Sequence, residues 1–297
     1  MIRVVNLSPA IDVTYQLPTL LPGNALRVEK VLRRPGGKGV NVARLIHAGG
    51  KKVKLVLPLG GSAGRWIADQ LNNLGIEIEA VSIEAETRTC VAVVAKEVTV
   101  LNEPAAEISI SEFNQLISML EEKVEVSVLS GSLPRNLTEA QLADLFSVLR
   151  KSSQKLIIDT SGKALLQACS HQPDLLKPNR EEILAATGEQ DLAIAVNTLL
   201  ELGAQAVLVS DGEGVAKLVR KNSELSAAPR KEEGNPTGAG DAMVALAAIS
   251  LSEDESDSHL LARSVAAGSL AVREEVAGQI DWSQLSALAA SIEVRDS

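Results

Sequence analysis

The sequence predicts an α/β protein with a mostly parallel central sheet and a second, smaller sheet inserted into it. Strand-like and helix-like segments alternate along most of the 297 residues, and this order is typical of βαβ units with right-handed crossovers. The composition is 45% apolar but only 2% aromatic, which suits aliphatic helices packed on a buried parallel sheet. Residues 12–35 and about 87–103 contain strand patterns without helices between them, and they predict the smaller sheet.

The alternating segments can be placed in order along the chain. Strands are expected where short β-branched runs end in polar residues or glycine, and helices where apolar residues recur with helical spacing. The expected strands are residues 3–7, 52–57, 124–130, 155–159 and 206–210, and the expected helices are residues 40–48, 63–74, 110–123, 139–151 and 192–202. A final helix and a frayed tail are expected from Asp281. In the smaller sheet, strands are expected at residues 13–17, 25–32, 89–95 and 99–101.

Bulk composition argues against several classes of function. The formal net charge of −9 disfavours general binding of nucleic acid, which requires a basic surface, and the few aromatic residues disfavour stacking of unpaired bases. No apolar run approaches the ~20 residues of a membrane span, and the first residues resemble a strand rather than a signal peptide. Cys90 and Cys169 show no metal-ligand spacing and are expected to be reduced core thiols. These observations predict a cytoplasmic protein.

A glycine-rich turn occupies residues 35–43, with the sequence Pro-Gly-Gly-Lys-Gly-Val-Asn-Val-Ala. Glycine lets the backbone approach a ligand closely, and the helix that follows would direct its first N–H groups towards an anion. The spacing matches neither a Walker A loop nor GxGxxG. Residues 27–44 contain six basic residues and one acidic residue, which would attract a small anion. The alternative interpretation is a tight strand-to-helix connection beneath a solvated basic face.

A second glycine-rich turn, Asn-Pro-Thr-Gly-Ala-Gly-Asp at residues 235–241, precedes the apolar helical run of residues 242–249. Its backbone can also bind an anion, and here a carboxylate lies in the same turn. Asp241 either caps the helix, which is a common use of the position, or serves phosphoryl transfer. In the second case backbone dipoles stabilise the equatorial oxygens while the carboxylate takes a hydroxyl proton.

These motifs together resemble the two signatures of the ribokinase-like PfkB carbohydrate kinases. Gly-Gly-Lys-Gly-Val-Asn at residues 36–41 and Gly-Ala-Gly-Asp at residues 238–241 match the signatures, and the resemblance covers essentially the whole chain. The branch of 1-phosphofructokinase and tagatose-6-phosphate kinase is the most similar, through residues 6–14, 130–134 and 177–182. Those segments are Asn-Leu-Ser-Pro-Ala-Ile-Asp-Val-Thr, Ser-Gly-Ser-Leu-Pro and Lys-Pro-Asn-Arg-Glu-Glu.

The resemblance implies one ribokinase-like domain over residues 1–297, in which a three-layer α/β/α core carries a small β-sheet that acts as a lid. The core would comprise about residues 1–11, 36–86 and 106–297, and the β-lid about residues 12–35 and 87–105. Such a lid excludes water, which would otherwise accept the phosphate. Because lids of relatives often pair between subunits, a homodimer through the β-lid is expected.

The resemblance also implies in-line transfer of the γ-phosphoryl group from MgATP to a sugar hydroxyl. Asp241 would accept the hydroxyl proton, and the backbone of the preceding glycine turn would stabilise the transferred group. Without the resemblance, the residues assigned to the sugar would be interpreted as caps, turn residues or solvated charges. The catalytic set implied is Gly238, Ala239, Gly240 and Asp241, and the sugar contacts are Asp12, Gly37, Lys38, Asn41, Arg88 and Ser130, with Arg27 as a weaker candidate.

Two further motifs are assigned to the nucleotide and its metal. Asn179 and Glu182, at positions i and i+3, either form a first-turn cap or, as the resemblance implies, organise Mg²⁺ and its waters near the phosphates of ATP. Residues 210–214 resemble the nucleotide loop, but Asp211 stands where the family more often has leucine and is expected to face solvent. The nucleotide contacts implied are Lys177, Asn179, Ser210, Gly212, Gly214, Thr237, Gly238 and Gly240.

The exact substrate stays open between related ketohexose phosphates. Phosphorylation of fructose 1-phosphate to fructose 1,6-bisphosphate is the first expectation for the branch. Cys90 and the Asn-Pro pair at residues 235–236 favour tagatose 6-phosphate, and fructose 6-phosphate is a third substrate of the branch. A nucleoside kinase is disfavoured because Lys38 and Arg88 would then meet no phosphate. A non-catalytic sugar-phosphate-binding regulatory protein is the alternative from another class, but it would be expected to lack the base or the magnesium pair.

Overall fold

Ten strands form the central sheet of the computed structural model, which describes residues 1–296. They are β1 (Ile2–Val5), β4 (Val53–Gly60), β5 (Glu77–Ile83), β8 (Val124–Ser130), β9 (Ser153–Asp159), β10 (Leu175–Leu176), β11 (Val207–Val209), β12 (Ala216–Arg220), β13 (Ser223–Ala227) and β14 (Val294–Asp296). Their order is β14-β13-β12-β11-β10-β9-β8-β1-β4-β5. The strands from β11 to β5 are parallel, whereas β12, β13 and β14 pair antiparallel. The carboxyl ends of the parallel strands therefore share one edge of the sheet.

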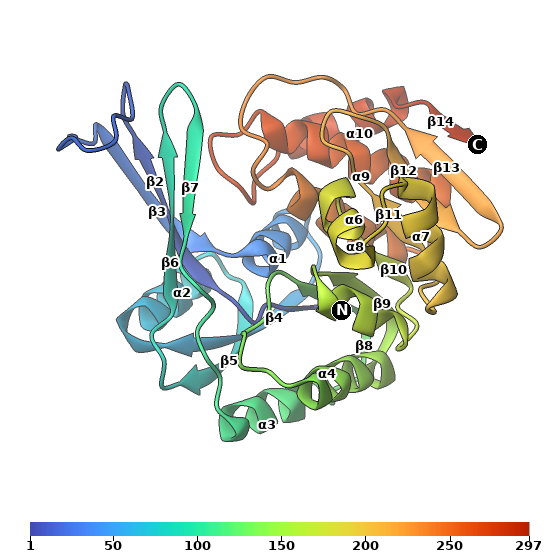
Figure 1. The fold of residues 1–297 in the computed structure, drawn as a ribbon, viewed down its shortest axis with the longest axis horizontal. Coiled ribbons are helices and arrows are strands. Elements are labelled where there is room, and N and C mark those ends of the chain that lie inside the picture. Colours follow the sequence, from blue (N-terminus) through green and yellow to red (C-terminus); the bar gives the residue numbers. More distant parts are fainter. Residues whose placement is uncertain (297) are drawn as a thin grey trace.

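Helices cover both faces of this sheet and complete three layers (Figure 1). One face carries α1 (Lys38–Ala48), α2 (Gly61–Asn73), α8 (Ala239–Ser252), α9 (Asp257–Val272) and α10 (Trp282–Ser291). The other face carries α3 (Ile110–Met119), α4 (Glu139–Ser152), α5 (Lys163–Cys169), α6 (Arg180–Thr187) and α7 (Leu192–Glu201). The two buried clusters between the layers are almost wholly aliphatic. The expected three-layer α/β/α fold is thus confirmed.

Helix α8 lies at the centre of its layer. All residues from Asp241 to Ser250 are buried, and the helix packs on α1, on α9 and on strands β1, β8 and β9. A helix that is apolar all round is enclosed by protein rather than by solvent. The position of its N-terminal turn, which holds Asp241, is therefore fixed by packing along the whole helix.

The smaller sheet consists of β2 (Ala10–Gln16), β3 (Lys30–Gly36), β6 (Arg88–Val94) and β7 (Val98–Asn102), in the order β3-β2-β6-β7. Figure 1 shows these four strands, here called the β-lid, rising beside α1 away from the helices of the core. Strands β2 and β6 are parallel, and the other two pairs are antiparallel. Asp12, Arg34 and Cys90 are direct partners across the strands, so their side chains share one face of the β-lid.

Two expectations about local structure are wrong for the same physical reason. A strand was expected at residues 25–32, but β3 extends from Lys30 to Gly36, because these are the residues that pair with β2. A frayed tail was expected after the last helix, but β14 pairs with β13 and extends the central sheet. Pairing between segments far apart in the chain leaves no periodic pattern in either segment, so neither feature could be recognised locally. Within residues 1–296, every helix is too short or too polar to cross a membrane.

Candidate active site

The turn before α8 places Asp241 at the carboxyl edge of the central sheet. Gly238 is the N-cap residue and has φ of +90°, a left-handed conformation that glycine adopts without strain. A Cβ at Gly238 would lie 2.7 Å from the Cβ of Ala277, and a Cβ at Gly240 would lie 3.1 Å from Lys177 Nζ. The left-handed conformation and the close contact with Ala277 require glycine at Gly238, whereas a Cβ at Gly240 would meet only the end of the flexible Lys177 side chain. The first N–H groups of α8 have no partner within the helix and form a site for an anion.

Asp241 is buried, with 6% of the residue exposed, and it does not cap its own helix. Its Oδ2 accepts a hydrogen bond of 2.9 Å from Asn41 Nδ2 of α1. Burial is the main cause that raises the pKa of Asp241 to about 7, and the charge of Asp159 adds to this effect, whereas Lys38 and the Asn41 hydrogen bond oppose it. A carboxyl group with a pKa near neutrality is suited to accept a proton from a substrate hydroxyl.

Asp159, at the end of β9, brings a second buried carboxylate to Asp241. Its Oδ2 accepts a hydrogen bond of 2.7 Å from Ser130 Oγ at the end of β8. Its Oδ1 lies 3.5 Å from Lys38 Nζ and has no hydrogen-bond partner within residues 1–296. Lys38 Nζ also lies 3.2 Å from Glu182 Oε1. Asp159 is the main cause that raises the pKa of Lys38 above its ordinary range, so the ammonium group stays charged among these carboxylates.

Asn179 and Glu182 form a capping box at the start of α6. The Glu182 N–H donates to Asn179 Oδ1 at 2.7 Å, and the Asn179 N–H donates to Glu182 Oε2 at 2.9 Å. Glu182 Oε1 faces Lys38, and the unpartnered Oδ1 of Asp159 faces the same ammonium group. Mg²⁺ binds proteins through few carboxylates and keeps waters or substrate phosphates as its other ligands. The side-chain oxygens of Glu182, Asn179 and Asp159 are ligands of the kind that Mg²⁺ binds in this manner.

Asp12 lies where the β-lid joins the first glycine-rich turn. A Cβ at Gly36 would lie 2.0 Å from Asp12 Cγ, so only glycine allows β3 to cover this carboxylate. Burial is the main cause that raises the pKa of Asp12, and the Gly37 N–H and the charge of Arg88 oppose it. Gly37 is the N-cap residue of α1, the helix that carries Asn41. The expected sugar residues of strand β2 and helix α1 are thus brought together.

The two arginines that were expected to contact the sugar, Arg88 and Arg27, occupy different places. Arg88 begins β6 and belongs to the same face of the β-lid as Asp12. Its Nη1 donates to the Glu103 carbonyl at 2.8 Å, its Nη2 donates to the Ser8 carbonyl at 3.1 Å, and its buried Nε has no partner within residues 1–296. Arg27 is exposed in the loop between β2 and β3, beyond the paired part of these strands. Of these two arginines, Arg88 is the one that lies next to Asp12.

The expected nucleotide residues follow β10 and β11 at the same edge of the sheet. Lys177 is 4% exposed, and its ammonium group lies beside Gly240. Ser210 joins Asn179 in an isolated parallel bridge, which brings the loops after β10 and β11 side by side. Gly212 has φ of +54°, so the loop after Ser210 turns through a left-handed conformation.

Gly214 and Thr237, the two remaining nucleotide candidates, are exposed, as is the side chain of the nearby Asp211. Asp211 pairs with Arg180 at 3.5 Å, and 41% of its side chain is exposed, which confirms that it faces solvent. Gly214 donates its N–H to the Asp211 carbonyl at 2.7 Å, which closes the loop after β11. Thr237 is exposed in the turn before α8, where its N–H donates to Asn235 Oδ1 at 3.0 Å.

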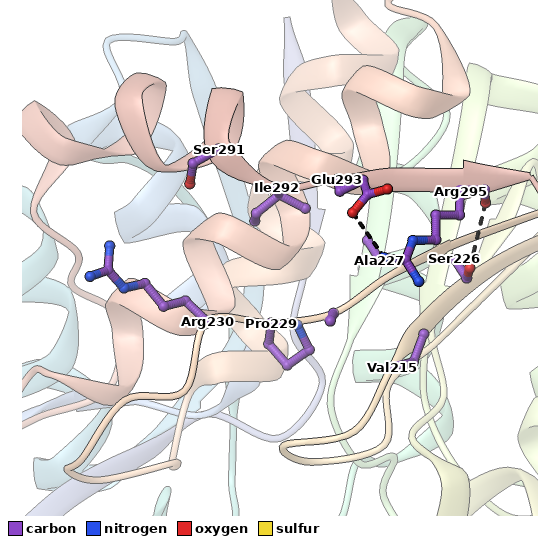
Figure 2. Close-up of a pocket in the computed structure, with 10 residues that line it drawn as sticks. Val215, Ser226, Ala227, Pro229, Arg230, Ser291, Ile292, Glu293 and Arg295 are labelled. Atoms are coloured by element: carbon purple, nitrogen blue, oxygen red, sulfur yellow. Dashed lines mark hydrogen bonds and ion pairs between the residues drawn. The ribbon is translucent and has the colours of Figure 1, made fainter.

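A cavity of about 400 Å³ begins at Val215, the residue that follows Gly214 in the chain. Figure 2 shows its walls, which come from the loop before β12, from the end of β13 and the segment after it, and from the segment between α10 and β14. None of its lining residues was among the residues assigned to the site from the sequence. They are Val215, Ser226, Ala227, Ala228, Pro229, Arg230, Ser291, Ile292, Glu293 and Arg295.

Three charged residues close to the site were not singled out from the sequence. Asp159 ends an expected strand, and the rule that ligands bind at the carboxyl ends of parallel strands could have identified it. Arg34 and Arg44 were part of the basic cluster of residues 27–44, but no local pattern distinguishes them from its other members. Their approach to Asp12 depends on the pairing of β3 with β2 and on the placement of α1.

Comparison with known proteins identifies relatives over nearly the whole chain. The model of the pfkB family carbohydrate kinase matches residues 4–283. Phosphofructokinase-2 from Escherichia coli is similar in two crystal structures, each 28% identical and each covering 97% of this chain and 98% of that chain. The complex with potassium has a TM-score of 0.92, and the complex with fructose-6-phosphate has a TM-score of 0.88. A "possible 1-phosphofructokinase" from Thermotoga maritima has the same fold, with 19% identity, coverage of 100% and 99%, and a TM-score of 0.90.

Proposed function

The chain belongs to the pfkB family of carbohydrate kinases, and we propose that within this family it is an ATP-dependent kinase of ketohexose phosphates. As a sugar kinase it transfers a phosphoryl group to a sugar hydroxyl. The observation that carries the proposal is the buried Asp241 carboxylate, which lies at the N-terminal turn of α8 and accepts a hydrogen bond from Asn41. Fructose 1-phosphate is the first substrate to test, with fructose 1,6-bisphosphate as the product.

The reaction proceeds by in-line attack of the sugar hydroxyl on the γ-phosphorus of ATP. The proton of that hydroxyl passes to Asp241 as the new O–P bond forms and the bond to the β-phosphate oxygen breaks, and ADP leaves. Asn41 Nδ2 holds the carboxylate in position at 2.9 Å. A pKa of about 7 leaves Asp241 ionised in part of the molecules at neutral pH and basic enough to take the proton.

The transferred group gains negative charge that the surrounding residues stabilise. The N–H groups of the turn formed by Gly238, Ala239 and Gly240 point at this group, and the ammonium groups of Lys38 and Lys177 flank it. Lys38 thereby serves the reacting phosphoryl group as well as the sugar, because its partners are the carboxylates beside Asp241. Bound Mg²⁺, held by Asn179 and Glu182 with Asp159 nearby, would neutralise the charge of the ATP phosphates.

The sugar is bound between the β-lid and α1. Asp12 and Asn41 accept or donate hydrogen bonds at its hydroxyl groups, and the backbone at Gly37 and the hydroxyl of Ser130 complete the contacts. Arg88 provides positive charge for the phosphate already on the sugar. Arg27 could contact the sugar only if the exposed loop in which it lies moved towards the site, or if it reached the site of a second subunit.

The nucleotide extends from the turn before α8 across the loop after β11. Ser210, Gly212 and Gly214 line its path, with Thr237 on the exposed side. The cavity that is lined by Val215, the residue after Gly214, offers apolar walls at Val215 and Pro229 (Figure 2). We therefore assign the adenine base to this end of the site.

Fructose 6-phosphate is the second candidate substrate, and the 28% identity to phosphofructokinase-2 from Escherichia coli favours it. Tagatose 6-phosphate is the third. An assay of ATP consumption should therefore compare fructose 1-phosphate, fructose 6-phosphate, tagatose 6-phosphate, fructose and ribose at equal concentrations, with Asp241→Asn as the inactive control. Turnover with at least one phosphorylated ketohexose is expected to exceed turnover with the free sugars. Preference for fructose or ribose would overturn the proposal, and binding of sugar phosphates without any turnover would favour a regulatory protein.

We also propose that two copies pair through their β-lids in the cytoplasm. Strand β7 is exposed along its whole length and forms one edge of the β-lid. Several large apolar side chains of the β-lid are exposed, among them Val31 (47%), Val100 (46%) and Leu101 (59%), as is typical of a protein interface. The free cysteines Cys90 and Cys169 suit a reducing compartment. Leu101→Lys is expected to convert a dimer to a monomer in light scattering, and a monomeric wild type would contradict this pairing.

A further inference from the structure

Three guanidinium groups surround the single carboxylate of Asp12. Arg34 lies directly opposite Asp12 on β3, Arg88 lies on the same face of β6, and Arg44 approaches from α1. All three act on Asp12 through their charges, in the order Arg88, Arg34, Arg44. Asp12 forms no direct ion pair within residues 1–296. The cluster of Asp12, Arg34, Arg44 and Arg88, here called the arginine cluster, thus has a formal charge of +2, from three arginines and one aspartate.

Arg34 and Arg44 converge on one neutral acceptor. Arg34 Nη1 donates to the carbonyl of Ala277 at 2.8 Å, and Arg44 Nη1 approaches the same oxygen at 3.5 Å. Burial is the main cause that lowers the pKa of each guanidinium, to about 10 for Arg44, and for Arg44 the charge of Arg34 is the second cause. One carbonyl cannot neutralise two cations or occupy two forks of five N–H donors each. Arg34 and Arg44 therefore lack both an equal negative charge and enough hydrogen-bond acceptors for their N–H groups.

Two other cations near the site already have anionic partners, and the charge of a third, Lys177, acts on Asp241. Lys38 is paired with Asp159 and Glu182, and Lys30 is paired with Glu275 at 3.3 Å. The excess positive charge of the site is consequently concentrated in the arginine cluster. A phosphate monoester carries about −1.5 to −2 charge at pH 7 and offers three acceptor oxygens, which matches both the charge and the donors that the cluster leaves uncompensated.

We propose that Arg34 and Arg44 bind the phosphate group already present on the sugar substrate, with Arg88 as the third cation of the same subsite. This inference rests on the proposed function, because it requires a phosphorylated sugar. Arg88 is anchored by the carbonyls of Glu103 and Ser8 and contributes mainly charge. Among residues 1–296, Arg34 is anchored through Nη1 alone, so the rest of its fork can bind phosphate in a bidentate manner.

The subsite also defines which sugars are accepted. Asp12 and the phosphate lie side by side, so the hydroxyl that Asp12 binds and the phosphorylated carbon are close together on the sugar. A sugar without phosphate would leave the arginine cluster uncompensated and desolvated when the β-lid covers it, which is costly. Arg34 and Arg44 therefore select phosphorylated over free sugars, whereas Lys38 acts at the transferred group.

The test compares Arg34→Gln with Arg33→Gln. Arg33 is the neighbouring residue of β3, is exposed and points to the opposite face, so it is a control matched in charge, strand and residue type. Loss of one charge-assisted bidentate contact is expected to raise the KM of the preferred sugar phosphate about 10- to 100-fold, with kcat within about threefold. Arg33→Gln is expected to leave both constants unchanged. Equal KM values for the two variants would overturn the proposal.

Binding of inorganic phosphate separates this inference from the proposed function. Inorganic phosphate is expected to inhibit the wild type competitively against the sugar substrate and the Arg34→Gln variant at least about tenfold more weakly. This readout holds whichever sugar the enzyme phosphorylates, so turnover of free sugars alone would refute the proposed function but not the anion site. If Arg34→Gln fails to fold, Arg34→Lys is the variant to test, because lysine keeps the positive charge but cannot bind phosphate in the bidentate manner of a guanidinium group. An Arg34→Lys enzyme with wild-type KM and wild-type phosphate inhibition would contradict the subsite.

Discussion

Replacement of Asp241 by asparagine is expected to slow turnover by orders of magnitude and, above pH 7, to make the folded protein more stable. The carboxyl group accepts the substrate proton, so its loss should lower kcat by about 10²- to 10⁴-fold. The same group is buried and lies close to Asp159, so its ionised form is unfavourable in the folded protein. Asparagine removes the charge and can still accept the hydrogen bond from Asn41.

The magnitude follows from the pKa of Asp241, which is raised from 3.8 to about 7. At about 1.36 kcal/mol for each pH unit, the difference amounts to about 4 kcal/mol as an upper limit. Because the pKa is raised in the folded state, the stabilising effect of the bound proton is fully present below pH 3.8 and is lost as the pH rises through 7. The variant and the wild type should therefore be equally stable near pH 4, and the variant should be more stable at pH 8.

Chemical denaturation at pH 4.5, 6 and 8, fitted to the free energy of unfolding, measures this difference. Asp281→Asn is the matched control, since Asp281 caps α10 and its hydrogen bonds with Ser283 and Gln284 lower its pKa. Its charged form is favoured in the folded state, so this variant should lose stability at neutral pH. For the wild type, kcat/KM should rise with pH up to about 7. An Asp241→Asn protein that is no more stable than the wild type at pH 8, or one that retains normal kcat, would refute the reasoning.

Three further substitutions test other parts of the structure. Glu182→Gln keeps the capping box, in which glutamine also serves, so the unfolding temperature should stay unchanged while the Mg²⁺ concentration for half-maximal activity rises; an unchanged Mg²⁺ requirement would exclude Glu182 from the metal site. Gly36→Ala places a methyl group 2.0 Å from Asp12 Cγ, so the KM of the sugar should rise about tenfold or more with the KM of ATP unaffected, and equal effects on both would show a general distortion. Arg3→Met leaves the carbonyls of Leu120 and Glu122 without the buried guanidinium that satisfies them, so the free energy of unfolding should fall by about 2–4 kcal/mol with kcat intact; a stability equal to the wild type would show that the pocket repacks around methionine.

Much of the fold and part of the site could be predicted from the sequence, because they depend on local patterns. Alternation of β-branched and helical segments indicated βαβ units and a parallel sheet, and the resemblance to the family implied the three layers. Glycine before a helix indicated two turns that could bind an anion. Asp241 was a candidate base because a carboxylate and its glycine turn are contiguous in the chain, and the resemblance to the family favoured this role over that of a helix cap. The Asn179–Glu182 pair was likewise visible, since both of its interpretations depend on one helical turn.

Only the tertiary structure decided how these local features meet. Asn41 reaches Asp241 across 200 residues of chain, and Asp159 reaches Lys38 from another strand, so neither pair leaves a periodic signal. Lys38 was expected to contact the sugar, and the folded chain adds that it lies close to two carboxylates, those of Asp159 and Glu182. Arg34 appeared to be one basic residue among six, but pairing of β3 with β2 sets it beside Asp12. The sequence determined which residues have the chemistry for phosphoryl transfer, and the folding of distant strands against α1 and α8 decided which charges are neutralised and which remain for the substrate.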